Sequence, residues 1–119
     1  MGSCTGSLVL AAAGVLDGVD ATTHWAVRDE LARLGAVPLN ERVVQRGKVV
    51  TAAGVSAGID MALTLAGQIA GHDAARAIQL MIEYDPAPPY DCGAPEKASP
   101  EVMALLEGVA SQMEGEPVR

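Results

Sequence analysis

The chain has 119 residues, of which half are hydrophobic, only one is Trp, two are Tyr and none is Phe, and its formal net charge is −7. This balance argues against nucleic-acid binding, because phosphate contacts need clustered basic side chains, and eight Lys and Arg are scattered here among fifteen Asp and Glu. The length predicts a single domain whose core is built from Ala, Val, Leu, Ile and Met.

The N-terminus lacks a basic region ahead of its apolar run, so no signal peptide is expected. Apolar stretches such as 9–16 are too short to cross a membrane. Two cysteines, Cys4 and Cys92, are expected to be reduced thiols, because one bridge in an acidic chain without secretory marks is a weak basis for a disulfide. We therefore expect a cytoplasmic protein that binds no membrane.

The first element in chain order is a tight strand-to-helix turn at Cys4. Small residues surround Cys4 in the segment Gly2-Ser3-Cys4-Thr5-Gly6-Ser7, and an apolar run follows. Such a turn projects one side chain outward, and the N–H groups of the next helix favour the thiolate, which is the nucleophilic form. Glycine-flanked turns in α/β hydrolases present a Ser nucleophile in the same way. The alternative is a small buried thiol.

The next segments alternate between helical and extended patterns. Helices are predicted over 5–14 and 25–34, the second stopped by Gly35, with a strand over 20–24 between them and an extended piece over 36–39. A hairpin follows, with strands 41–45 and 48–52 on either side of Arg46-Gly47. Short connections between strands and helices predict an α/β layered sheet, although only two or three strands are clear.

The second half of the chain is predicted to be helical apart from one loop. A glycine-bearing turn over 53–58 opens a helix over 59–70, and Asp73 is expected to cap the next helix. The segment 85–95 is rich in proline and is expected to be a loop. Ser99 is expected to cap a final helix, whose predicted buried side consists of Leu105, Leu106, Val109 and Met113.

Several segments together resemble a known family. The turn Ser3-Cys4-Thr5-Gly6, the strand 21–24, the hairpin 41–51 and the segment 53–63 have the order and spacing of the ThiJ/PfpI branch of the class I glutamine amidotransferase-like superfamily. Within that branch, the segment 77–86 and the following Pro88-Pro89-Tyr90-Asp91 are most similar to the isonitrile hydratases. The resemblance covers residues 2–95.

The resemblance implies a flavodoxin-like layered sheet with flanking helices, of which this chain matches the C-terminal half. Residues 1–95 would form a partial ThiJ/PfpI-like domain that begins at the turn, and residues 96–119 a C-terminal helix and tail. The sequence is then interpreted as a fragment or as a gene product with a mis-set start. The acidic partner of the family's cysteine would lie in the preceding half, and a homodimer is expected.

The same resemblance implies a cysteine-dependent hydration of isonitriles to N-substituted formamides, with a small-molecule substrate, no cofactor and no metal. Cys4, Thr5 and His24 are the candidate catalytic residues, with Cys4 as nucleophile and His24 orienting or deprotonating the thiol. The candidate substrate-binding residues are Gly6, Trp25 and Gly54.

Each candidate also has a structural alternative. Thr5 is expected either to act in catalysis or to cap a helix with its hydroxyl, and His24 is alternatively a hydrogen-bonded residue at a strand end. Trp25 is equally compatible with the core. Asp60 is interpreted as a helix-start charge, and Arg42 as part of a solvated hairpin face together with Glu41, Arg46 and Lys48.

Two other classes of function remain open. The same fold precedes helix-turn-helix modules in some transcription regulators, which would make this chain a ligand-sensing domain without catalysis. A basic helix-turn-helix pattern is not found after Pro95, and this favours an enzyme. The third reading is a non-catalytic domain that oligomerises through exposed apolar surface.

Overall fold

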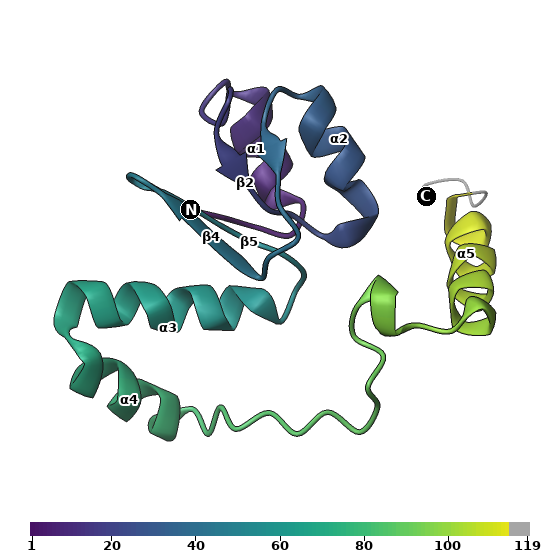
Figure 1. Ribbon diagram of the computed structural model, residues 1–119. Coiled ribbons are helices and arrows are strands. Elements are labelled where there is room, and N and C mark those ends of the chain that lie inside the picture. The colour runs from purple at the N-terminus through teal and green to yellow at the C-terminus, as the bar shows by residue number, and fades with distance from the viewer. Residues whose placement is uncertain (115–119) are drawn as a thin grey trace. The chain divides into compact units, whose positions relative to one another are not determined.

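The structure, a computed structural model, describes residues 1–114 (Figure 1). Contacts divide it into two units, Met1–Asp85 and the residues from Pro86 onward. Helices and strands are mixed around small sheets, which confirms the predicted α/β class. None of the helices within residues 1–114 combines the length and the apolar character that a membrane crossing would require.

The first unit contains a three-stranded sheet in the order β1-β5-β4. Strand β1 (Gly2–Ser3) runs parallel to β5 (Val49–Ala52), which pairs antiparallel with β4 (Val43–Arg46). The predicted hairpin is therefore present, but its turn lies one residue later than expected. Because Arg46 pairs with Val49, the two loop residues are Gly47 and Lys48, and Gly47 has the positive φ of +61° that such turns need.

A second, two-stranded sheet pairs β2 (Asp20–Ala21) with β3 (Val37–Pro38) in parallel. The predicted strand over 20–24 is therefore shorter than expected, since it ends at Ala21. Helix α1 (Gly6–Ala12), helix α2 (Arg28–Arg33) and this sheet enclose one core, which is centred on the fully buried Leu16 and Leu31. Figure 1 shows α1 and α2 on one side of the β4–β5 hairpin, with α3 on the other.

Helix α3 (Ala57–Ala70) lies along β4 and β5 and buries Met61 against Val50 and Ala52. Its second residue, Gly58, permits a close approach to the strand before Cys4. A Cβ at Gly58 would lie 3.0 Å from the Ser3 Oγ, which is closer than ordinary van der Waals contact. The predicted end of this helix at Gly71 is confirmed, with a φ of +96°.

Helix α4 (His72–Met81) packs against α3. The predicted cap by Asp73 is wrong, because α4 starts at His72 and Asp73 instead pairs with Arg76 across one helical turn, at 3.0 Å. Most of the large apolar side chains of α4 stay exposed, and Leu80 and Met81 are about four-fifths accessible.

The second unit contains a 3₁₀ turn, η2 (Pro95–Lys97), and helix α5 (Pro100–Glu114). The predicted cap is confirmed, because the Ser99 Oγ accepts a hydrogen bond from the Val102 N–H at 3.3 Å. The predicted buried side of this helix is wrong. The four apolar residues expected to be buried are all exposed: Leu105, Leu106, Val109 and Met113. The described part of this unit offers α5 no second layer on which to pack.

Candidate functional site

Cys4 stands in a strained bend between β1 and α1. Strand β1 ends at Ser3 and α1 begins at Gly6, so the strand-to-helix turn predicted from the sequence is present. Cys4 has a φ of +53°, in the left-handed region that residues with a side chain rarely adopt. Its N–H donates to the carbonyl oxygens of Ala52 at 3.2 Å and Ala53 at 2.8 Å, so the end of β5 holds this strained backbone in place.

Two buried threonines support the bend from another side. The Thr23 hydroxyl donates to the Cys4 carbonyl oxygen at 2.5 Å, and the Thr22 N–H donates to the Thr51 Oγ1 at 2.9 Å. All three threonines are almost completely buried. The sequence pattern predicted only a strand for Thr22 and Thr23. The signal available was the Thr23 hydroxyl, because most buried hydroxyls are hydrogen-bonded.

His24 caps a 3₁₀ turn, η1 (Trp25–Val27), rather than opening one continuous helix over 25–34. The His24 Nδ1 accepts a hydrogen bond from the Ala26 N–H at 3.1 Å. In a neutral imidazole whose Nδ1 is an acceptor, the proton resides on Nε2. This tautomer donates a hydrogen bond from Nε2 and has no free lone pair for a thiol proton, which favours the orienting role considered for His24 over the role of a base.

The candidate binding residues Trp25 and Gly54 both lie beside His24. A Cβ at Gly54 would be 3.6 Å from the His24 Cδ2, and the Trp25 ring centroid lies 5.4 Å from that of the imidazole, with a 32° angle between the planes. Gly54 directly follows Ala53, whose carbonyl oxygen accepts a hydrogen bond from the Cys4 N–H. The structure thus brings His24, Trp25 and Gly54 to the ends of β2 and β5 at which Cys4 is fixed.

Thr5 and Gly6 complete the turn. The Thr5 side chain is exposed and forms no cap hydrogen bond, so the alternative of a helix-capping hydroxyl is wrong. A Cβ at Gly6 would meet no atom within 4 Å outside its own chain neighbours. Open space therefore lies beside the turn at Gly6, next to the exposed Thr5 hydroxyl.

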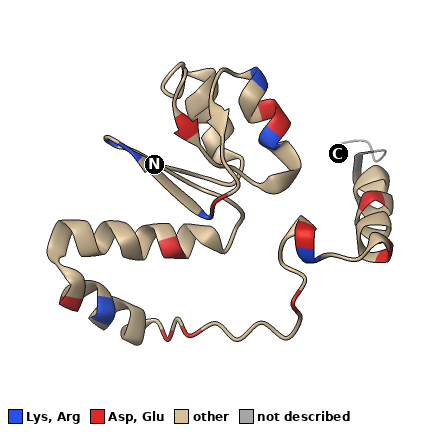
Figure 2. Ribbon diagram, viewed as in Figure 1, with Lys and Arg blue, Asp and Glu red and all other residues tan. Residues whose placement is uncertain are grey.

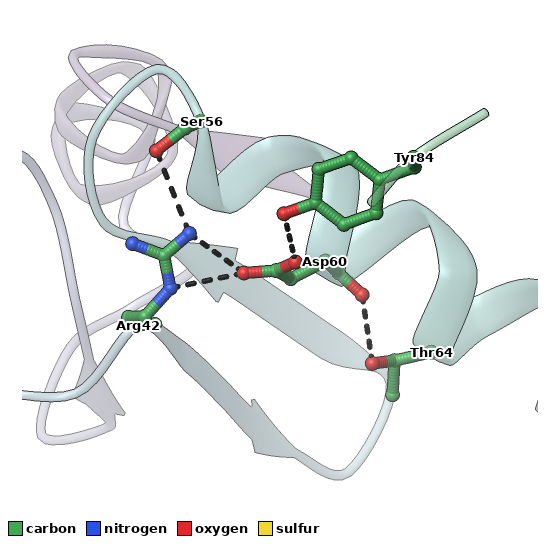
Figure 3. A network of polar contacts seen from close by, with 5 residues as sticks. All are labelled: Arg42, Ser56, Asp60, Thr64 and Tyr84. Carbon is green, nitrogen blue, oxygen red and sulfur yellow. Dashed lines mark hydrogen bonds and ion pairs between the residues drawn. The ribbon is translucent and has the colours of Figure 1, made fainter. Parts of the chain in front are cut away.

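A second polar cluster, centred on Asp60, was missed by the sequence analysis (Figure 3). Asp60 Oδ2 accepts hydrogen bonds from Arg42 Nε at 2.9 Å and Nη2 at 2.6 Å, and Asp60 Oδ1 accepts one from the Tyr84 hydroxyl at 2.6 Å. Arg42 Nη2 also reaches the Ser56 Oγ at 3.5 Å. The expectation that Arg42 lies on a solvated hairpin face is confirmed, because its side chain is 58% exposed. Its guanidinium also joins the hairpin to α3.

The cluster shifts two ionisation equilibria. Partial burial by itself would raise the pKa of Asp60, but the hydrogen bonds from Tyr84 and Arg42 and the Arg42 charge hold this pKa below its ordinary value of 3.8. The hydrogen bond to Asp60, followed by desolvation, raises the pKa of Tyr84 above 10.0, because ionised tyrosine would face a carboxylate. Both shifts favour an ionised Asp60 and a neutral Tyr84.

Other parts of the molecule add little to the candidate site. An apolar hollow of about 490 Å³ between α3 and α4 includes none of the candidate residues; it is lined by Val55, Gly58, Ile59, Ala62, Leu63, Ala66, Ile78 and Ile82. Within residues 1–114, no three His, Cys, Asp or Glu side chains are placed to hold a metal ion together. Figure 2 shows Lys and Arg spread over α2, the hairpin, α4 and the segment before α5.

Comparisons with known proteins identify the family of this chain. Residues 3–68 match the model of the DJ-1/PfpI family. Isonitrile hydratase from Pseudomonas putida is 55% identical over 100 residues, covering 84% of this chain and 44% of that protein. The HTH-type transcriptional regulator GlxA from Rhizobium meliloti (strain 1021) is 32% identical over 124 residues, covering 95% of this chain and 38% of the regulator.

A solved structure is similar over nearly the whole chain. The crystal structure of a ThiJ/PfpI family protein from Pseudomonas syringae superimposes with a TM-score of 0.85 at 44% identity, and the match covers 92% of this chain and 46% of that protein. The chain spans less than half the length of each of these three relatives. The matched family model and the shared fold lead to one conclusion: the chain belongs to the DJ-1/PfpI family.

Proposed function

We propose that this chain carries the cysteine-bearing part of an enzyme that hydrates isonitriles to N-substituted formamides. The observation that supports it is Cys4, held at a φ of +53° by backbone hydrogen bonds at the end of β5. Strained backbone at a nucleophile is typical of catalytic turns. The 55% identity to isonitrile hydratase over 84% of the chain supports the choice of substrate class.

The reaction consumes one water. The Cys4 thiolate forms a carbon–sulfur bond to the terminal isonitrile carbon, which also takes up one proton, and the product is a thioimidate. Water then adds to the same carbon while the nitrogen takes up a proton. Cleavage of the carbon–sulfur bond returns the thiolate and, after loss of the hydroxyl proton, leaves the N-substituted formamide.

The remaining candidates have supporting roles in this proposal. His24, with its proton on Nε2, orients the reacting groups as a hydrogen-bond donor, and the exposed Thr5 hydroxyl takes part in proton delivery. Gly6 leaves room for the substrate beside the turn, and Trp25 and Gly54 line the same side as His24. Residues 1–95 act as the partial catalytic domain in this proposal.

A chimera tests the proposal. The 100 matched residues of the Pseudomonas putida isonitrile hydratase are replaced by the corresponding residues of this chain, so that the rest of that enzyme supplies the acidic residue implied by the family resemblance. With a simple alkyl isonitrile, we expect formamide production in the chimera and its loss in the Cys4→Ala variant. Cys92→Ala is the matched control and should keep the activity.

Two outcomes would contradict the proposal. One is formamide production that persists in Cys4→Ala, which would remove the nucleophile. The other is a chimera that melts cooperatively, shows the size of the parent enzyme and makes no formamide.

A ligand-sensing role is the second candidate, and the similarity to the regulator GlxA over 95% of this chain favours it. The Cys4→Ala variant separates the two, because a sensor would not need the thiol.

We also propose a homodimer, since large apolar side chains are exposed along α4. Sedimentation of the 119-residue chain at several concentrations tests this; a monomer at every concentration would contradict it.

A further inference from the structure

Cys4 is held by hydrogen bonds on both of its peptide groups. Its N–H is fixed by the carbonyls of Ala52 and Ala53, at the end of β5. Its C=O accepts from the Thr23 hydroxyl at 2.5 Å and from the Ser7 N–H at 3.3 Å. Both hydrogen bonds restrain the peptide plane that follows Cys4, and the one from Thr23 comes from a side chain 19 positions away in the chain.

Thr23 is itself rigidly placed. Its side chain is completely buried, and the neighbouring Thr22 N–H is bound to the Thr51 Oγ1 in β5. The hydrogen bonds thus run from β5 through the segment 22–23 to the carbonyl of Cys4, while β5 also holds the N–H of Cys4. A residue in the left-handed region persists only where its surroundings fix it in this way.

We propose that Thr23 is a positioning residue for the nucleophile: its hydroxyl fixes the Cys4 peptide and thereby the direction of the Cys4 thiol. Thr23 acts through the backbone of Cys4 and does not touch the substrate. The proposal rests on the proposed role of Cys4 as nucleophile. The test uses a general alkylating probe instead of an isonitrile, so that the positioning role of Thr23 and the isonitrile chemistry can fail separately.

Thr22 and Thr23 form a matched pair for this test. Both are completely buried, but only the Thr23 hydroxyl is bonded to Cys4, and the Thr22 Oγ1 has no hydrogen-bond partner among residues 1–114. Thr23→Val removes the bonded hydroxyl at nearly constant volume, and Thr23→Ser keeps it. Thr22→Val removes a hydroxyl that is not bonded, so it should leave the turn unchanged.

The measurement is the rate of iodoacetamide alkylation at Cys4 relative to Cys92 in the same sample, read by mass spectrometry across pH. In Thr23→Val we expect this ratio to fall about fivefold, on the order of what one intramolecular hydrogen bond contributes. Thr23→Ser should restore it, and Thr22→Val should match the parent. Cys92 lies in the other unit and serves as the reference for probe concentration and pH. An unchanged or increased ratio in folded Thr23→Val overturns the proposal.

A measurement on the parent chain decides the question if Thr23→Val does not fold. In a sample labelled with ¹³C at the carbonyl of Cys4, we expect a slowly exchanging Thr23 hydroxyl proton that correlates with this carbonyl in the NMR spectrum. A Thr23 hydroxyl proton in fast exchange with water would overturn the proposal. A positive result together with an inactive chimera would keep Thr23 as a positioning residue and reject the isonitrile chemistry.

Discussion

The Tyr84 hydroxyl donates a hydrogen bond to the Asp60 Oδ1 at 2.6 Å, which joins the segment after α4 to the first turn of α3. Asp60 in turn binds Arg42, just before β4, at 2.6 Å. Glu83, the residue before Tyr84, has a φ of +53°, in the left-handed region. One carboxylate therefore links the hairpin, α3 and the end of α4.

Tyr84→Phe is expected to lower the midpoint of urea unfolding, because it removes one hydrogen bond to a charged acceptor and keeps the ring. Tyr90→Phe is the matched control, since Tyr90 is 79% exposed and should tolerate the change. Equilibrium unfolding followed by far-ultraviolet circular dichroism measures both variants. Equal midpoints for the two variants would show that the Tyr84 bond contributes nothing to stability.

Asp60 should make the protein sensitive to acid. Its pKa in the folded state lies below 3.8, so the folded state binds this proton less tightly than the unfolded chain does. The stability that Asp60 contributes is therefore fully present above about pH 4–5 and is lost as the pH falls from 3.8 through the folded-state pKa. Urea midpoints measured at a series of acidic pH values should show this loss.

Asp60→Asn should weaken this acid dependence, while its midpoint near pH 7 falls, because Arg42 loses a charged partner. Asp73→Asn is the control, since it removes the carboxylate of a strongly exposed pair of the kind that contributes little to stability. If the urea midpoint of Asp60→Asn falls with acid as steeply as that of the parent, Asp60 is not the group responsible for the acid sensitivity.

Leu31→Ala should destabilise the first unit strongly. Leu31 is completely buried in the core between α1, α2 and the two-stranded sheet, so the truncation is expected to lower the free energy of unfolding by about 2–5 kcal/mol. Leu80→Ala, at a position that is 81% exposed, should cost much less. Chemical denaturation compares the two variants, and similar losses would place the core elsewhere.

His24→Asn separates the two ring nitrogens of His24. The Asn oxygen can replace Nδ1 as the acceptor for the Ala26 N–H, so the turn at η1 and the melting temperature should be preserved. The Nε2 donor is lost, and we expect kcat of the chimera for isonitrile hydration to fall about 100-fold. His24→Ala, which loses both nitrogens, is the comparison for stability. Full activity in His24→Asn would remove His24 from the chemistry.

The sequence by itself determined the elements that depend on local signals. Glycines and periodic apolar residues were sufficient to predict the turn at Cys4, the hairpin, and the helix that ends at Gly71, because these features depend on backbone freedom and side-chain spacing over a few residues. The Ser99 cap belongs to the same class, since a capping hydroxyl acts on the N–H three residues later.

Only the tertiary structure decided the contacts between residues far apart in the chain. Thr23 meets the carbonyl of Cys4 across 19 positions, and Tyr84 meets Asp60 across 24. The helical pattern after Ser99 likewise predicted an apolar face but not what covers it, and Leu105 is 70% exposed. The physical reason is that periodicity fixes which side chains share a face, whereas burial and hydrogen-bond partners depend on which segments the fold brings together.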